Sequence, residues 1–409
     1  MPNRPLSDIV SCLSGYDPEA LPVEQARQIV LDFIRPVEEI ENVAIGNALD
    51  RVLAIDVVSP IDVPAHDNSA MDGYALRSAD LQPGATTLRV IGSALAGNAF
   101  DGTVTAGECV HIMTGAVMPD GCDTVVPQEF AETVGTDRIT LMPNAVQPGD
   151  NRRLKGEDLA IGQIALRQGT LLRPAHLGLL ASLGMTEIPV RRKLRVAFFS
   201  TGDELRPLGE PLDEGCIYDS NRYTIYGMLT RLGCELIDMG IVRDDPALLE
   251  TAFRSACENA DAIITSGGVS VGAADYTKQV MARLGDMHFW KIAMRPGRPM
   301  AFGRISSNGN SAVLFGLPGN PVAVMVTFYF LAREALRFMM GTNPAPLPLW
   351  QAKSLASIRK KAGRTEYQRG ILSRNANGEL QVEITGSQGS GILSSMTEAN
   401  CFIVLPDNR

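Results

Sequence analysis

The sequence predicts an α/β domain in the second half of the chain, with β-rich parts on either side of it. Strand and helix patterns alternate from residue 194 to about residue 340, which is typical of a doubly wound, mostly parallel sheet. Short apolar and β-branched runs separated by glycine turns cover residues 85–141 and recur after residue 349, which is typical of small β-domains. A length of 409 residues is enough for two to four domains.

Composition excludes several classes of protein. Hydrophobic residues make up 45% of the chain and charged residues 20%, as in ordinary globular proteins. The net charge of −9 argues against a nonspecific nucleic-acid binder. The seven cysteines are scattered without a C-x-x-C pair, so neither a zinc ribbon nor a disulfide framework is indicated. Because no signal-peptide core or membrane-length apolar run is present, we expect a cytoplasmic protein that binds no membrane.

The first part of the chain is expected to be helical and then extended. Residues 23–33 carry apolar side chains at helical spacing, and Pro36 follows them. Residues 43–45 and 52–58 fit a helix or a strand equally well. Residues 62–74 are rich in Asp, Asn, Ser and Gly, so we expect a loop there. Turn chemistry explains that composition without any functional role.

The α/β part can be followed element by element. Asp219 or Ser220 is the expected N-cap of a helix that ends at Gly233, and Asp245 with Pro246 starts the next helix. We interpret that Asp245 as structural. The predicted strands are residues 194–199, 235–241, 261–265, 300–305 and 312–315, and the predicted helices are residues 219–232, 246–259, 276–284 and 322–340.

Acidic residues follow three strands of the predicted sheet. Glu204, Asp244 and Asp275 lie in loops that leave strand ends, and the carboxyl ends of parallel strands meet at one edge of a sheet. Gly267 and Gly268 begin the same turn that contains Asp275, and a glycine turn before a helix exposes N–H groups that suit a phosphate. An acid does not suit a bare anion, but Mg²⁺ binds one or two carboxylates together with ligand phosphates. The loops therefore predict a metal-and-phosphate site.

A basic segment lies near that edge in the sequence. Lys291, Arg295 and Arg298 could hold phosphate oxygens, although a solvated loop would have the same composition. No P-loop lysine motif and no G-x-G-x-x-G occur, so neither a P-loop NTPase nor an NAD-binding domain is supported. The residues alone predict an enzyme that binds a phosphorylated ligand and a divalent metal, without identifying the ligand.

Seven ordered motifs closely resemble one known family. They are DNSAMDGYA (67–75), IMTGA (112–116), NRRLKGED (151–158), FSTGDEL (199–205), SGGVSVGAADYTK (266–278), PGRPMAFG (296–303) and GLPGNPV (316–322). Together they resemble the MoeA-type molybdopterin molybdenumtransferases, also found as the E domain of gephyrin. The resemblance implies an elongated homodimer of four-domain chains. The implied domains are 1–60 with 150–190 (dimerisation), 61–149 (inserted β-domain), 191–343 (three-layer α/β, molybdopterin-binding) and 344–409 (barrel-like β-domain).

The resemblance also implies a reaction and its residues. Family members insert molybdate into adenylylated molybdopterin and release AMP, with Mg²⁺ required. The implied catalytic residues are Asp72, Thr114, Glu204, Asp244, Asp275 and Lys291, with Glu204, Asp244 and Asp275 near the metal. The implied ligand-binding residues are Gly267, Gly268, Ser270, Arg295, Arg298, Pro318, Gly319, Arg369 and Ser390. Asp72 and Thr114 would reach the pocket of the partner subunit. The pathway's adenylyltransferase and molybdoenzyme acceptors are further implied partners.

The chain departs from the family pattern in two places. Arg295 and Arg298 stand where family members often have Lys, and the two side chains differ in hydrogen-bond geometry. Family members usually continue with one or two more strands, so we expect a shortened last domain with an open edge. Two alternative functions remain open: a molybdopterin adenylyltransferase, which shares the α/β domain, and a non-catalytic scaffold of the gephyrin kind.

Overall fold

The computed structural model describes residues 5–13, 15–269, 275–343 and 345–407. The chain forms two compact units. The larger unit consists of Met1–Glu41, Asp50–Ala54 and Pro189–Arg409, and the smaller one of Asn42–Leu49 and Ile55–Ile188. The division into four domains is finer than this and stays a prediction. Within the described residues, no helix combines the length and the apolar character needed to cross a lipid bilayer.

A six-stranded sheet forms the centre of the larger unit. Its strands in spatial order are β16 (Glu235–Val242), β13 (Arg195–Thr201), β17 (Ala262–Ser266), β21 (Asn310–Leu317), β20 (Pro299–Ser307) and β18 (Gly285–Lys291). The first four strands run parallel, and β20 runs antiparallel to both of its neighbours. The predicted, mostly parallel sheet is confirmed. The edge strand β18 was not predicted from the sequence, because its alternation of polar and apolar residues is irregular.

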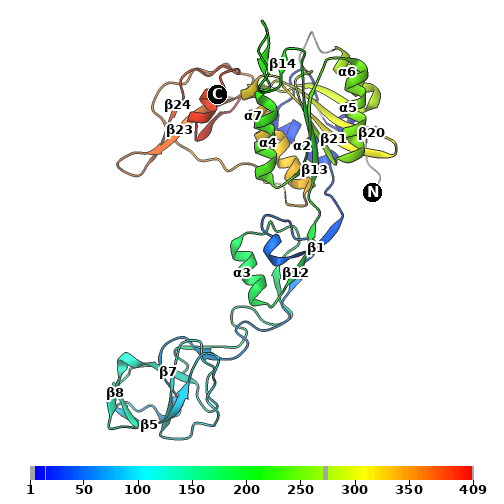
Figure 1. Ribbon diagram of the computed structural model, residues 1–409. Coiled ribbons are helices and arrows are strands. Elements are labelled where there is room, and N and C mark those ends of the chain that lie inside the picture. Colours follow the sequence, from blue (N-terminus) through cyan, green and yellow to red (C-terminus); the bar gives the residue numbers. More distant parts are fainter. Residues whose placement is uncertain (1–4, 14, 270–274, 344, 408–409) are drawn as a thin grey trace. The chain divides into compact units, whose positions relative to one another are not determined.

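Helices cover both faces of this sheet (Figure 1). One pair is α4 (Ser220–Leu232) and α7 (Pro321–Thr327), and the other is α5 (Pro246–Asn259) and α6 (Asp275–Leu284). Phe199 and Ile263 of the sheet pack with Phe253 of α5 and Met281 of α6 in one buried core. The central part therefore has the three layers that the strand and helix alternation predicts.

The helix starts follow the predicted capping chemistry. The Asp219 side chain accepts a hydrogen bond from the backbone N–H of Arg222, and Gly233 adopts the left-handed conformation at the end of α4. At the start of α5, one Asp245 oxygen accepts from the backbone N–H groups of Ala247 and Leu248, each at 2.9 Å. The predicted structural role of Asp245 as an N-cap is confirmed.

The predicted helix 322–340 is interrupted. After α7 comes a π-helical turn, η4 (Phe328–Ala332), and then α8 (Arg333–Met339). Near the N-terminus are α1 (Leu6–Ser11) and α2 (Val23–Phe33), the latter with the bounds that the helical spacing predicts. Phe33 of α2 packs edge-on against Phe302 of β20, with ring centroids 5.4 Å apart. The N-terminal segment is thereby part of the α/β core.

The C-terminal part forms a second sheet in the larger unit. Its elements are β19 (Met294–Arg295), β22 (Lys353–Ser354), β23 (Thr365–Arg374), β24 (Leu380–Ile384), β25 (Cys401–Leu405) and the helix α9 (Ser394–Glu398). β19 pairs with β23 through Met294–Thr365 and Arg295–Glu366. Part of the basic segment is therefore a strand of the C-terminal sheet. The alternative interpretation as a solvated loop is therefore only partly correct: the two residues pair as a strand, but Arg295 is exposed to solvent.

The smaller unit contains a six-stranded mixed sheet. In spatial order its strands are β7 (Thr124–Pro127), β4 (Gly73–Leu76), β6 (Glu108–Ile112), β5 (Thr86–Ala94), β9 (Arg138–Leu141) and β8 (Ala131–Val134). Neighbouring residues alternate between two buried clusters: Ala75 and Val125 belong to one, Leu76 and Val126 to the other. This period of two places one core on each face of the sheet and confirms the predicted β-rich character.

The expected loop at residues 62–74 is only partly correct. It contains β3 (Asn68–Ser69), which pairs with β10 (Arg152–Arg153), and β4 begins at Gly73. A Cβ atom on Gly73 would lie 1.9 Å from the carbonyl oxygen of Val126, so the glycine permits β4 and β7 to approach. The remaining elements are β1 (Ile40–Ala44), η1 (Ile45–Asn47), β2 (Val57–Val58), η2 (Ser78–Asp80), η3 (Gln128–Phe130), β11 (Ile164–Leu166), α3 (Pro174–Ser182), β12 (Glu187–Arg191), β14 (Leu205–Arg206) and β15 (Ile217–Tyr218).

Candidate functional site

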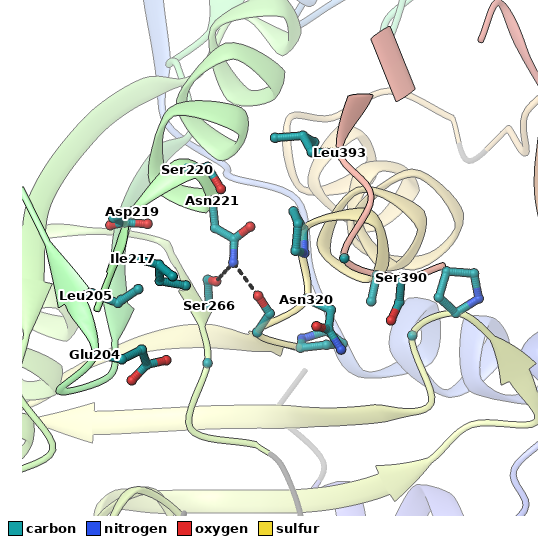
Figure 2. Close-up of a pocket in the computed structure, with 18 of the residues that line it drawn as sticks. Glu204, Leu205, Ile217, Asp219, Ser220, Asn221, Ser266, Asn320, Ser390 and Leu393 are labelled. Carbon is teal, nitrogen blue, oxygen red and sulfur yellow. Dashed lines mark hydrogen bonds between the residues drawn. The ribbon is translucent and has the colours of Figure 1, made fainter. Parts of the chain in front are cut away.

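A cleft of about 710 Å³ opens at the carboxyl ends of β13, β17 and β21. Part of its lining is shown in Figure 2. It is lined by Thr201, Glu204 and Leu205, by residues 217–221, by Ser266 and Gly267, by residues 295–297 and Pro299, by residues 318–321 and Ala323, and by Gln388, Ser390, Gly391 and Leu393. The expectation that loops leaving several parallel strands meet at one edge is confirmed. The C-terminal sheet contributes the opposite side.

Asn221 connects three of these loops. Its Nδ2 atom donates to Ser266 Oγ at 2.8 Å and to the carbonyl oxygen of Gly319 at 2.7 Å (Figure 2). Gly267 lets the turn after β17 lie close against Thr201 of β13. A Cβ on Gly267 would lie 2.4 Å from the carbonyl oxygen of Thr201, and its φ of +91° also favours glycine. The start of α4, the end of β17 and the turn after β21 therefore form one connected floor.

Sequence reasoning missed Asn221. The available signal was its position as the second residue of a helix that follows a strand of the sheet, where side chains face the ligand edge. The predicted residues Gly267, Pro318 and Gly319 do line the cleft. Gly268 follows in the same turn with a φ of +67°. Ser270 lies outside the described residues.

Asp219 is the most deeply buried acid at the cleft. Its side chain is 2% exposed. Oδ1 accepts hydrogen bonds from Ser200 Oγ at 2.9 Å and from the backbone N–H of Arg222 at 3.1 Å. Oδ2 is buried and has no hydrogen-bond partner among the described residues. Burial raises the pKa of the Asp219 carboxyl above its ordinary value, because the charged form loses hydration.

Glu204 lines the cleft, whereas Asp244 is not among its described lining residues but lies close enough to Glu204 for their charges to interact. Burial raises the pKa of the Asp244 carboxyl, and the negative charges of Asp203 and Glu204 raise it further. Oδ1 of Asp244 is buried without a hydrogen-bond partner in the described part of the chain. Mg²⁺ needs only one or two carboxylates when phosphates complete its shell, so Glu204 and the unpartnered oxygen of Asp244 fit the chemistry of that ion.

The predicted metal trio itself stays a prediction. Among the described residues, no three His, Cys, Asp or Glu side chains are arranged to hold a metal ion. α6 begins at Asp275, but the Asp275 side chain lies outside the described part of the structure. Glu204 and Asp244 are therefore the two members of the trio that can be placed, and both fit the chemistry of the ion.

Of the three predicted basic residues, only Arg295 lines the cleft. Its Nη1 atom lies 3.8 Å from a carboxylate oxygen of the buried Glu366. Lys291 instead forms an ion pair with Glu19, and Arg298 donates to the carbonyl oxygen of Glu19 at 3.2 Å. Lys291 and Arg298 are not among the described residues that line the cleft, so their ligand roles stay predictions.

Arg369 holds the loop that carries Ser390. Its side chain is 1% exposed, and its Nη2 atom donates to the carbonyl oxygen of Gly389 at 2.9 Å. Its Nε atom donates to Ser395 Oγ at 2.9 Å, and burial lowers its pKa. The backbone N–H of Val322 donates to the carbonyl oxygen of Ser390 at 3.1 Å, which joins this loop to α7. Arg369 therefore stabilises the conformation of the loop that contains Ser390.

Asp72 and Thr114 are brought together in the smaller unit. The Thr114 backbone N–H and hydroxyl both donate to Asp72 Oδ1, at 2.7 and 2.6 Å. These bonds hold the pKa of the Asp72 carboxyl below its usual value. Asp67 is used differently: its carboxylate pairs with Arg152 and accepts from the backbone N–H of Lys155 at 2.7 Å. Of the acids in this segment, Asp72 is the one whose partner is another predicted site residue.

Comparisons with known proteins agree with this arrangement. Residues 21–184 match the family model "MoeA N-terminal region (domain I and II)", residues 197–337 the "probable molybdopterin binding domain" and residues 351–409 the "MoeA C-terminal region (domain IV)". A molybdopterin molybdenumtransferase of Haemophilus influenzae is 43% identical over 390 residues, which cover 95% of each chain. Gephyrin of Dictyostelium discoideum is 32% identical, covering 95% of this chain and 60% of gephyrin.

A solved structure shows the same fold along the chain. The crystal structure of a molybdopterin biosynthesis moeA protein from Pyrococcus horikoshii OT3 has a TM-score of 0.82 and 30% sequence identity, and it covers 96% of each chain. The sequence motifs, the cleft at the sheet edge and the match over nearly the full length lead to one conclusion. This chain belongs to the MoeA family of molybdopterin molybdenumtransferases.

Proposed function

We propose that this protein inserts molybdate into adenylylated molybdopterin during molybdenum cofactor biosynthesis, with release of AMP and a requirement for Mg²⁺. The observation that carries the proposal is the 43% identity to a molybdopterin molybdenumtransferase over 95% of both chains. The cleft supports it, because about 710 Å³ lies within the usual range for a site that binds a molecule of this size.

The cleft residues suit the parts of such a ligand. The turns at Gly267 and Gly319 bring backbone close to the cleft, as phosphate groups require. The guanidinium of Arg295 supplies positive charge at the side facing the C-terminal sheet, where Ser390 also lies. These groups would bind and orient the pyrophosphate and exclude water from it.

Glu204 and Asp244 are the residues that would hold Mg²⁺. When bound, the ion would supply a Lewis acid that stabilises negative charge on the phosphate oxygens as AMP leaves. The residues' own contribution is to place two carboxylates beside the phosphate-binding turns. Neutralising Asp244 by mutation is expected to raise the Mg²⁺ concentration that activity requires.

The remaining expectations are part of the same proposal. The protein would be a cytoplasmic homodimer, and Asp72 with Thr114 would act at the cleft of the partner subunit. The exposed position of Thr114 supports this, because its hydroxyl is accessible to a ligand. The pathway's adenylyltransferase would supply the substrate, and molybdoenzymes would accept the product.

The decisive experiment measures molybdate-dependent AMP release from adenylylated molybdopterin by the purified protein. We expect release with Mg²⁺, none after chelation, and at least a tenfold slower rate for Asp244→Asn. Asp245→Asn is the matched control, because Asp245 serves as a helix cap and Asn also caps well. Pyrophosphate release from molybdopterin and Mg-ATP would instead favour an adenylyltransferase. No AMP release together with stoichiometric capture of a membrane-receptor tail would favour a scaffold.

A further inference from the structure

Three oxygen atoms of residues that line the cleft have no hydrogen-bond partner among the described residues. They are Thr201 Oγ1, Asp219 Oδ2 and Asn221 Oδ1, and all three residues line the cleft. Each atom is shielded from solvent. A buried acceptor without a donor costs free energy until a donor reaches it. Asp219 and Asn221 both belong to the start of α4, so two of these atoms provide hydrogen-bond acceptors on the same side of the cleft.

Helix capping does not explain the burial of Asp219. Asp245 caps α5 with one oxygen and remains exposed, whereas Asp219 caps α4 and is 2% exposed. Capping uses only Oδ1 of Asp219, which also accepts from the Ser200 hydroxyl. Those two donors orient the carboxylate, and Oδ2 makes no hydrogen bond with the described residues. The burial of a second, unused carboxylate oxygen therefore points to a ligand.

Asn221 likewise has one side-chain atom that is hydrogen-bonded within the fold and one that has no partner among the described residues. Both hydrogen bonds that its side chain makes are donated by Nδ2, to Ser266 Oγ and to the carbonyl oxygen of Gly319. With its nitrogen occupied, the side-chain amide has only its oxygen, an acceptor, left for a ligand. Figure 2 shows Asp219 and Asn221 on the same side of the cleft, on the α4 side, with Ser390 on the other side. The α4 side therefore offers acceptors, while Arg295, which also lines the cleft, belongs to the C-terminal sheet through β19.

We propose that Asp219 and Asn221 are specificity-determining residues that accept hydrogen bonds from N–H groups of the ligand's nitrogen heterocycle. The inference rests on the proposed function, and it assigns the pterin part of the substrate to the α4 side of the cleft. A pterin ring carries neighbouring ring and exocyclic N–H donors, which match the acceptors of Asp219 and Asn221. The pyrophosphate, which joins the pterin part to AMP, then lies toward Arg295 and Ser390. A site built from acceptors discriminates strongly against an analogue that lacks the donor.

Asp219→Asn tests this sharply. Its amide oxygen can still cap α4 and accept from Ser200, because Asn is as good a cap as Asp, but an NH₂ group replaces the second acceptor. We expect the dissociation constant for molybdopterin to rise at least about tenfold, because a donor then meets a donor. The dissociation constant for inorganic pyrophosphate, which has no N–H donor and probes only the phosphate-binding part of the cleft, should change less than about twofold. Asp245→Asn, the capping control, should change neither.

A second readout measures discrimination directly. Pterin and pteridine-2,4-dione differ because the dione has an oxygen in place of the exocyclic amino group. As competitors of molybdopterin binding, pterin should be at least about tenfold stronger than the dione with the wild-type protein. Asp219→Asn should reduce that preference to about threefold or less. If Asp219 only supported the fold, its substitution would lower the affinity for both competitors by the same factor.

Two results would overturn the inference. One is an unchanged affinity of Asp219→Asn for molybdopterin, and the other is an equal loss of affinity for molybdopterin and inorganic pyrophosphate. Failure of the proposed function would have a different signature: the wild-type protein would release no AMP on addition of molybdate, whatever its preference between the two pteridines. A loss of folding is detected independently by thermal unfolding of each variant.

Discussion

The carboxylate of Asp72 accepts two hydrogen bonds from Thr114 through a single oxygen, one from the backbone N–H at 2.7 Å and one from the hydroxyl at 2.6 Å. Asp72 directly precedes β4, and Thr114 follows β6, its antiparallel neighbour. Two motifs that are 42 residues apart are thus joined at the same end of adjacent strands. The pair keeps Asp72 ionised and leaves its other oxygen outside these two bonds.

Thr114→Val should raise the pKa of Asp72. The substitution removes the hydroxyl donor, which contributes most to lowering that pKa, while the backbone donor remains. The sign follows from the carboxylate: a lost donor favours the protonated form. We expect a higher Asp72 pKa by ¹³C NMR and at least tenfold slower AMP release. Thr87→Val is the control, because Thr87 pairs only with the Thr140 hydroxyl in the same sheet. An unmoved Asp72 pKa would contradict the prediction.

Asp219→Asn should stabilise the protein at neutral pH. Burial raises the folded-state pKa of Asp219, so its contribution to stability is complete below the unfolded pKa and is lost as pH rises through the folded pKa. The amide cannot ionise and avoids that loss. We expect the variant to be more stable than the wild-type protein at pH 7, with the difference shrinking toward pH 4, as measured by urea unfolding. Lower stability of the variant at every pH would mean that Oδ2 has a stabilising partner in the fold.

Arg369→Lys should loosen the loop that contains Gln388 and Ser390. Lysine cannot reproduce the separate bonds to Ser395 Oγ and to the Gly389 carbonyl, because its single ammonium lacks the fork geometry of arginine. We expect a loss of roughly 2–4 kcal/mol in the free energy of unfolding and a higher KM for adenylylated molybdopterin. Arg374→Lys is a matched control in the same strand, since Arg374 is exposed. Equal effects of the two substitutions would exclude the loop-holding role.

Substituting Lys291 and Glu19 one at a time distinguishes a role of Lys291 in activity from its role in the ion pair. Both side chains are partly exposed, so their ion pair is expected to contribute no more than about 1 kcal/mol. If Lys291 contacts the substrate during turnover, Lys291→Gln should slow AMP release at least tenfold, whereas Glu19→Gln should leave it within about twofold. Steady-state rates and thermal unfolding of both variants are the measurements. Equal, small losses in both would show that Lys291 serves only the ion pair.

The parts of the fold that depend on neighbouring residues were predictable. The caps at Asp219 and Asp245 follow from local hydrogen bonding to the next turn. The alternation of strands and helices similarly implies a parallel sheet, whose carboxyl edge then gathers Glu204 and Gly267 at one cleft. Arg369 was also named from the family resemblance, but its role as the support of a loop was not, because its hydrogen-bond partners lie elsewhere in the sequence.

Sequence by itself determined the family, the central sheet and the edge at which the site lies, because period, capping and motif order are local properties of the chain. Only the tertiary structure decided how individual side chains are used. It paired Lys291 with Glu19, made Met294 and Arg295 a strand of the C-terminal sheet, and joined Asn221 to two distant loops. It also left one oxygen of Asp219 buried and unpartnered. Burial and long-range hydrogen bonds depend on residues far apart in the chain, and no local pattern encodes them.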